Sequence, residues 1–217
     1  MTLKRGDVTF SKGQDRLFGH IDQYVLLSVA LAFAAFAFAR PRHPGNGDIE
    51  ISVDSEAFPL CLDIPADGVM AAAFREEGAE ARTLHILDRR RSGDMSQETA
   101  FTRGFNNVLW LPISPIFVDF YERYRPWVES AYGKQSNWPD VFYFARLVRN
   151  AISHGGALHF THDPKRTALW HHLSYDFGHH GTQIIGPRGA FSPADLVFLM
   201  MDASDELDRI GCPMAPQ

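Results

Sequence analysis

Residues 141–156 read VFYFARLVRNAISHGG, and this stretch indicates the kind of fold that the chain should adopt. At about 100° per residue, its apolar side chains fall on one stripe of a helix, which we expect to face the core. That stripe contains Val141, Phe144, Ala145, Val148, Ala151 and Ile152, and a second, mixed stripe contains Tyr143, Leu147, Asn150 and His154. Pro139 before the segment and two glycines after it are typical of the start and the end of a helix. The segment therefore predicts an α-helix that is buried on two sides.

Three polar side chains near the end of this predicted helix suit chemistry on a phosphate. The imidazole of His154 can accept a proton from a ribose 2′-hydroxyl or donate one to a leaving 5′-oxygen. The guanidinium of Arg149 suits charge that develops on phosphate oxygens, and the amide of Asn150 can orient either group. Asn150 and His154 share the second stripe, whereas Arg149 lies about a quarter turn away. The alternative is structural, with Arg149 paired to a surface carboxylate and His154 acting as a helix C-terminal cation.

The same segment resembles the signature helix of the HEPN superfamily, the higher eukaryotes and prokaryotes nucleotide-binding domains. That family's motif is an arginine, four to six residues of which the first is commonly polar, and a histidine near the end of a helix. Arg149, Asn150 and His154 match it with four intervening residues. The resemblance covers about sixteen residues. It implies an α-helical bundle, a homodimer that places two motifs across one groove, and frequent metal-independent endoribonuclease activity in toxin or antiviral systems.

Residues and resemblance together predict a homodimeric RNase without a metal or cofactor. His154 would be the general acid or base, Arg149 the phosphate stabiliser and Asn150 the orienting group, and the product would carry a 2′,3′-cyclic phosphate. Tyr143, Arg146 and Ser153 are predicted to line the RNA groove. A toxin–antitoxin or defence role, with an antitoxin protein as partner, is a further implication. The alternative is a non-catalytic HEPN module that binds nucleotide, RNA or a protein partner.

We predict one domain over residues 1–217, mainly α, as a HEPN-like helical bundle with a small β-hairpin insert after the motif helix. Residues 1–112 would form N-terminal helices and a short strand region, and residues 113–210 the motif-bearing core with the β insert at 157–186. Beside the motif helix, helices are expected over residues 15–39 and 69–90, from the Ser114-Pro115 cap through Tyr124, and from the Ser192-Pro193 cap through Leu207. Strands are expected at 49–53, 157–162, 167–175 and 182–185, and a loop at 92–97.

Charge and hydropathy limit the compartment and the partners. The net charge of −5 argues against a basic coat for long nucleic acid, although it leaves room for a local basic groove. The uncharged run at residues 23–39 has 17 residues, shorter than the roughly 20 that cross a bilayer. We therefore expect a buried or dimer-facing helix, no membrane, and a cytoplasmic protein. The isolated Cys61 and Cys212 predict buried free thiols.

Six histidines follow the motif and raise a third alternative, a zinc or nickel site. They are His159, His162, His171, His172, His179 and His180. Adjacent histidines on a strand point to opposite faces, and no cysteine or regular ligand spacing accompanies them. We therefore predict no metal site, and expect polar hairpin residues or contacts that line an RNA groove.

Overall fold

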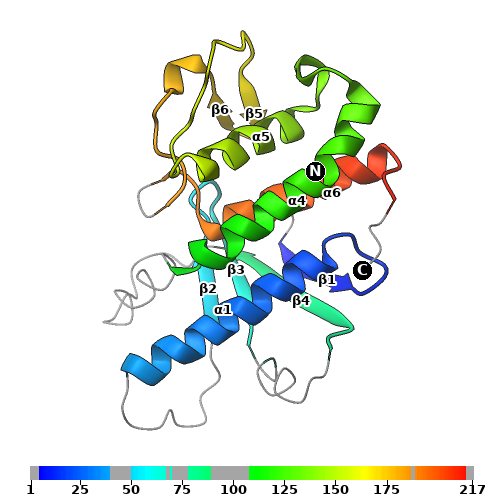
Figure 1. The fold of residues 1–217 in the computed structure, drawn as a ribbon. Coiled ribbons are helices and arrows are strands. Elements are labelled where there is room, and N and C mark those ends of the chain that lie inside the picture. The colour runs from blue at the N-terminus through cyan, green and yellow to red at the C-terminus, as the bar shows by residue number, and fades with distance from the viewer. Residues whose placement is uncertain are drawn as a thin grey trace.

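A computed structural model describes residues 5–39, 50–66, 69, 78–88, 108–186 and 189–213 (Figure 1). In these residues, a four-stranded antiparallel sheet is combined with four α-helices and a separate two-stranded hairpin. The prediction of a mainly α helical bundle is therefore wrong, because the N-terminal half contributes a whole sheet to a mixed α/β fold. The expected loop at residues 92–97 and residues 70–77 of the expected helix lie outside the described residues.

The sheet has the order β1-β4-β3-β2, and every neighbouring pair is antiparallel. Its strands are β1 (Gly6–Ser11), β2 (Glu50–Asp54), β3 (Leu60–Pro65) and β4 (Ala81–Asp88). Residues 81–88 were expected to continue a helix, but Leu84 and Ile86 are buried at a spacing of two, which is the strand period. Leu84 lies opposite Val8, and Ile86 lies opposite Leu62. Pairing with two partner strands outweighs the local helical pattern.

Helix α1 (Phe18–Ala39) packs against this sheet and against helix α4. Its buried side chains include Ile21, Tyr24, Val25 and Val29. By length and composition it could cross a membrane, and 44% of its apolar window Phe18–Ala35 is buried inside the protein. Asp22 pairs with Arg82 of β4 at 2.6 Å, which ties the first turns of α1 to the sheet.

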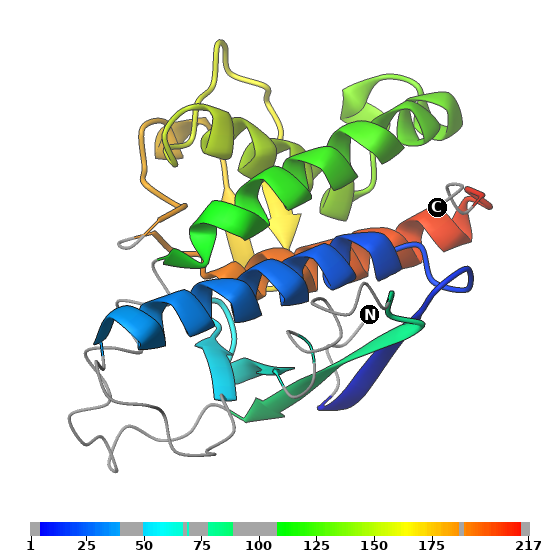
Figure 2. The same cartoon turned by 60° about the horizontal axis from the view of Figure 1, so that its bottom comes forward.

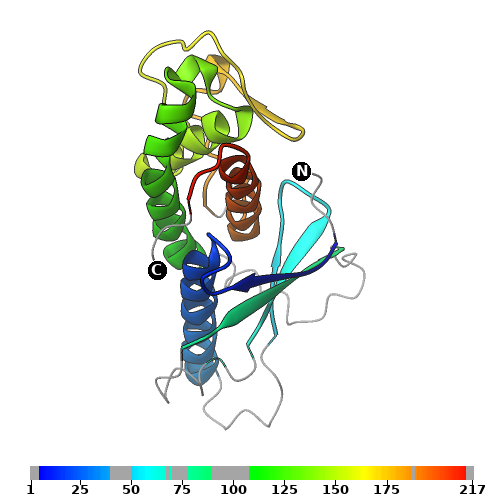
Figure 3. The same cartoon turned by 90° about the vertical axis from the view of Figure 1, so that its right-hand side faces the viewer.

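Helix α6 (Pro193–Arg209) lies at the centre of the fold, between the sheet on one side and α4 and α5 on the other (Figure 3). Figure 2 shows α1, α6 and α4 running side by side. The predicted Ser192-Pro193 start is confirmed, since Ser192 and Asp195 form a capping box. The buried Asp195 carboxylate also accepts hydrogen bonds from the Ser55 hydroxyl and, at 3.0 Å, from the Glu56 amide. Asp195 thereby joins α6 to the β2–β3 loop.

Helices α4 (Trp110–Tyr132) and α5 (Asp140–Ser153) form the outer part of the molecule. The predicted cap at Ser114 is wrong, because the helix begins earlier and Pro115 lies inside it. Gly133, at φ +68°, ends α4. A 3₁₀ turn, η1 (Gln135–Asn137), then leads into α5, whose N-cap is Pro139.

A small hairpin of β5 (Ala168–Trp170) and β6 (Leu173–Tyr175) follows α5 and packs on it. The single strand expected at 167–175 is instead two strands that turn at His171, which has a φ of +49°. Neither 157–162 nor 182–185 forms a strand, and Ala157 and Gln183 make only an isolated bridge. Cys61 and Cys212 are buried thiols outside any disulfide, as predicted.

His20 makes stability depend on pH where α1 meets α4. The ring is buried edge-on against Phe120, and Nε2 lies 3.1 Å from a carboxylate oxygen of Asp119, which also pairs with Arg123. Burial lowers the pKa of His20 below 6.5, although Asp119 opposes the effect. Because the unfolded chain then binds the proton more tightly, the free energy of unfolding should fall as pH drops from about 6.5 through the lower folded-state pKa.

Urea unfolding between pH 7.5 and 5.5 measures this effect. We expect His20→Gln to flatten the decline in the free energy of unfolding, because the amide does not titrate yet can still donate to Asp119. The exposed His172→Gln is the matched control and should leave the decline unchanged. An identical decline in wild type and His20→Gln would show that His20 is not responsible.

Candidate functional site

The N-terminal end of α5 is held by an arginine from the segment that follows the helix. Arg166 donates to the carbonyl oxygens of Gln135, Ser136 and Trp138 at 2.8–3.2 Å and pairs with Asp140 at 2.8 Å. Its guanidinium carbon also lies 4.2 Å from the centroid of the Tyr143 ring. These contacts bring residues 160–166 back over α5 and build one wall of a cleft.

The C-terminal end of α5 turns sharply because two glycines follow His154. Gly155 and Gly156 have φ values of +71° and +94°, which residues other than glycine rarely adopt. A Cβ on Gly156 would lie 2.4 Å from the carbonyl oxygen of Ile185, so this position requires glycine. The Gly156 carbonyl accepts from the amides of Ile184 and Ile185. The predicted C-terminal glycines thus reverse the chain and return it toward the helix.

Between these two ends, the second stripe of α5 forms the floor of a cleft of about 310 Å³. The helix contributes Tyr143, Arg146, Leu147, Asn150 and His154, and the returning segment and η1 contribute Gln135, Ser136, His159, Phe160, Thr161, His162, Pro164 and Arg166. No Asp or Glu belongs to this lining. The described part of the cleft therefore presents cations, imidazoles and neutral donors, which is the composition that an anion prefers.

Four of the six predicted site residues meet in this cleft: Tyr143, Arg146, Asn150 and His154. Within the described residues, neither the guanidinium of Arg146 nor the amide of Asn150 has a hydrogen-bond or ion-pair partner, so both are available to a ligand. Tyr143 is almost fully buried, and burial raises the pKa of its phenol, while Arg146 and Arg166 oppose that effect. It therefore remains a neutral hydroxyl at neutral pH.

The other two predicted residues, Arg149 and Ser153, do not line the cleft. Arg149 Nη2 lies 2.6 Å from a carboxylate oxygen of Glu122 on α4, and both side chains are about one-third exposed, at 32% and 34%. Ser153 Oγ donates to the backbone carbonyl of Arg149 at 3.2 Å. The α5 arginine that shares the cleft with His154 is therefore Arg146.

Sequence reasoning did not single out two further cleft residues, His159 and Arg166. The His159 ring stacks on the His154 ring with centroids 4.2 Å apart and an interplanar angle of 26°. The sequence presented His159 only as one of six histidines, and no motif or spacing around Arg166 pointed to a site. Both residues lie against α5 because the backbone of residues 155–167 folds back over the helix. That backbone path depends on contacts between residues far apart in the sequence.

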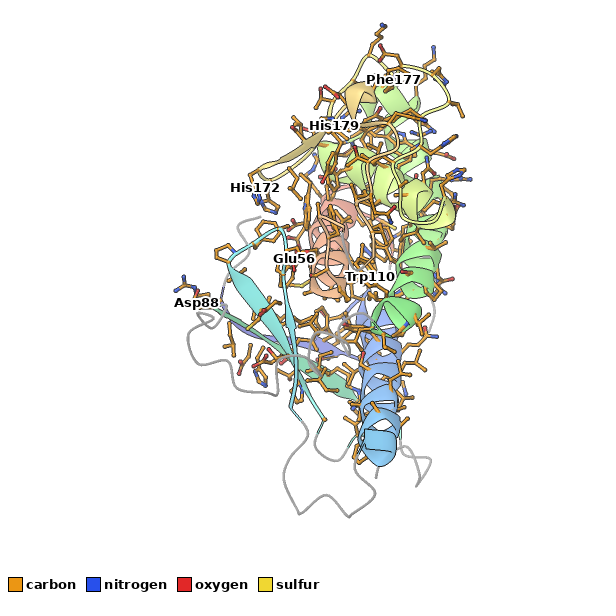
Figure 4. The ribbon with its side chains drawn as sticks, turned by 90° about the vertical axis from the view of Figure 1, so that its left-hand side faces the viewer. Glu56, Asp88, Trp110, His172, Phe177 and His179 are labelled. Atoms are coloured by element: carbon orange, nitrogen blue, oxygen red, sulfur yellow. The ribbon has the colours of Figure 1, made fainter. Side chains whose placement is uncertain are left out.

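The six downstream histidines do not gather at one point. His159 and His162 line the cleft, and the His180 ring centroid lies 5.4 Å from that of His159. His171 bonds to Asp202 at 2.7 Å and His179 to Asp176 at 2.8 Å, while His180 Nδ1 accepts from the Phe160 amide. The His172 ring centroid lies 5.5 Å from that of Phe58 in the β2–β3 loop, and Figure 4 shows His172 on the side of Glu56. Among the residues that the structure describes, no group of three or more His, Cys, Asp or Glu side chains could hold one metal ion.

A second hollow, of about 410 Å³, lies across the end of α5 and the start of α4. It is lined by Trp110, Leu111, Ser114, Ile152, Gly155, Gly156, Gln183, Ile185 and Gly186. None of these lining residues has a titratable side chain, so this hollow offers no proton-transfer group.

No profile of a known protein family, no curated protein and no solved structure matches the chain. The resemblance of residues 141–156 to the HEPN motif remains a prediction.

Proposed function

We propose that this protein is a metal-independent endoribonuclease whose active site is the cleft on α5. One observation carries the proposal: Arg146, with no partner among the described residues, shares a cleft without acidic lining side chains with Asn150 and the imidazole of His154. A fixed cation can stabilise charge on a phosphodiester, and an imidazole beside it can accept or donate the proton that cleavage moves.

The reaction follows from these groups. The ribose 2′-oxygen forms a bond to phosphorus while its proton passes to an imidazole, and the bond from phosphorus to the 5′-oxygen breaks as that oxygen receives a proton. The products are a 2′,3′-cyclic phosphate and a 5′-hydroxyl. Arg146 stabilises the charge that builds on the non-bridging oxygens, and Asn150, one turn before His154, orients the phosphate. Phe160, at the cleft wall, is placed to stack on an unpaired base.

Cleavage of RNA in excess EDTA tests the proposal. Wild-type protein should cleave mixed single-stranded RNA, its products should end in 2′,3′-cyclic phosphate, and DNA and 2′-O-methyl RNA of the same sequence should remain intact because they lack the nucleophile. Mass spectrometry of the fragments identifies the ends. Cleavage that disappears in EDTA and returns with Mg²⁺ would contradict the metal-independent mechanism.

Absence of cleavage on every RNA would contradict the nuclease. Retention of RNA by the uncleaving protein would then favour the non-catalytic binding module. The homodimer with a composite groove, the antitoxin partner and the cytoplasmic location remain separate proposals that the cleft does not require.

A further inference from the structure

We infer that His159 is a second catalytic histidine, so that one protomer carries both proton-transfer groups of the reaction. The inference rests on the proposed ribonuclease function and deepens it. Cleavage moves two protons, one from the 2′-hydroxyl and one to the 5′-oxygen, and these oxygens lie on opposite sides of phosphorus. A single imidazole cannot contact both oxygens in the same transition state.

The separation of the two rings suits this task. The His154 and His159 centroids are 4.2 Å apart, and the rings are inclined by only 26°. Pairs of metal ions that clamp the attacking and leaving oxygens of an in-line displacement stand about 3.5–4 Å apart. Two nearly parallel imidazoles at a similar spacing can each direct one nitrogen to one of these oxygens. Within the described residues, no hydrogen bond engages either ring.

The backbone on both sides of His159 holds the ring in this place. Leu158 is buried, its amide donates to Thr182 at 2.9 Å, and its carbonyl accepts from Gly181 at 2.8 Å. On the other side, the Phe160 amide donates to Nδ1 of His180 at 3.1 Å. His159 is thus fixed by its two neighbours, while its own imidazole stays exposed in the cleft.

In the proposed step, one imidazole enters neutral and takes the 2′-proton, and the other enters protonated and gives its proton to the 5′-oxygen. The pair ends the step with the two protonation states exchanged, and proton exchange with water restores them. No oxidant, metal or second protein is needed. Arg146 faces the non-bridging oxygens throughout.

Substrates with a sulfur in place of the bridging 5′-oxygen separate the two roles, because a thiolate leaves without being protonated. On ordinary RNA, His154→Ala and His159→Ala should each lose at least about 100-fold in single-turnover rate. On the 5′-thio substrate, only the variant that lacks the general acid should recover to near the wild-type rate. His172→Ala, at an exposed position that does not line the cleft, is the control and should keep nearly full activity on both substrates.

Three outcomes overturn the inference while the proposed function stands: His159→Ala cleaves ordinary RNA within about threefold of wild type, the thio substrate rescues both variants, or it rescues neither. His159→Asn and circular dichroism show whether a loss comes from misfolding, since the asparagine keeps a polar side chain that cannot transfer the proton. Wild type that cleaves no RNA overturns the proposed function itself, and the inference falls with it.

Coexpression tests whether both groups belong to one protomer. If each cleft uses its own His154 and His159, coexpressed His154→Ala and His159→Ala chains should stay inactive, because every cleft lacks one group. Recovery of activity in the coexpressed pair would show that the two histidines come from different chains and would overturn the single-protomer site.

Discussion

Replacing His154 by alanine should lower kcat/KM for RNA cleavage by about 100- to 10,000-fold, the range that a positioned acid or base contributes. This is among the largest losses that we expect from one substitution, because the imidazole transfers a proton at the reacting phosphate and no other α5 side chain in the cleft carries an imidazole. The rate should be measured under single-turnover conditions in EDTA, so that product release does not hide the chemical step.

The fold should survive this substitution. His154 caps α5 through its backbone amide, which bonds to Asn150 and Ala151 at 3.0 Å, and alanine retains that amide. We expect the melting temperature to change little. His172→Ala, beside the β2–β3 loop (Figure 4) and not in the lining of the cleft, is the matched control and should cleave like wild type. Full activity of His154→Ala would remove the central residue of the proposed mechanism.

Arg146→Ala should lower kcat/KM by about 100- to 1,000-fold, the effect of removing one donor aimed at an oxyanion in other enzymes. The physical reason is that Arg146 has no partner in the described structure and faces the cleft, so its charge is free to stabilise the transition state. Arg146→Lys should restore part of the loss, because it retains the charge without the planar fork of donors.

Arg149→Ala is the matched comparison, since it removes an arginine only three positions along the same helix. The Arg149 side chain is paired with Glu122, and both are about one-third exposed, so its loss should cost about 1 kcal/mol or less in stability and leave cleavage within about twofold of wild type. The reverse result, with Arg149→Ala inactive and Arg146→Ala active, would support the motif-based role of Arg149 instead.

Local pattern predicted two helices well. In α5, the apolar stripe and the closing glycines both act within one or two turns, so sequence spacing was sufficient. The same holds for α6, where Ser192 and Asp195 cap the helix reciprocally. Each of these signals depends on neighbours along the chain and needs no knowledge of the rest of the fold.

The sheet could not be predicted in this way. Residues 81–88 contain Leu84, Ile86 and Leu87, which fit a helical stripe as readily as a strand, and the choice depends on pairing with β1 more than 70 residues away. The apparent helix therefore became a central strand, and the predicted bundle became a mixed fold. Long-range pairing is invisible to a pattern that is read over one window.

By itself, the sequence determined that α5 has a second, mixed stripe that includes Asn150 and His154, and that two glycines follow the helix. Only the tertiary structure decided which groups join that stripe. Arg149 forms an ion pair with Glu122 of α4, and Arg146 faces the cleft instead. The segment that returns over α5 stacks the ring of His159 on that of His154. Helical geometry is a local property of the chain, whereas pairing and stacking depend on segments that meet only after folding.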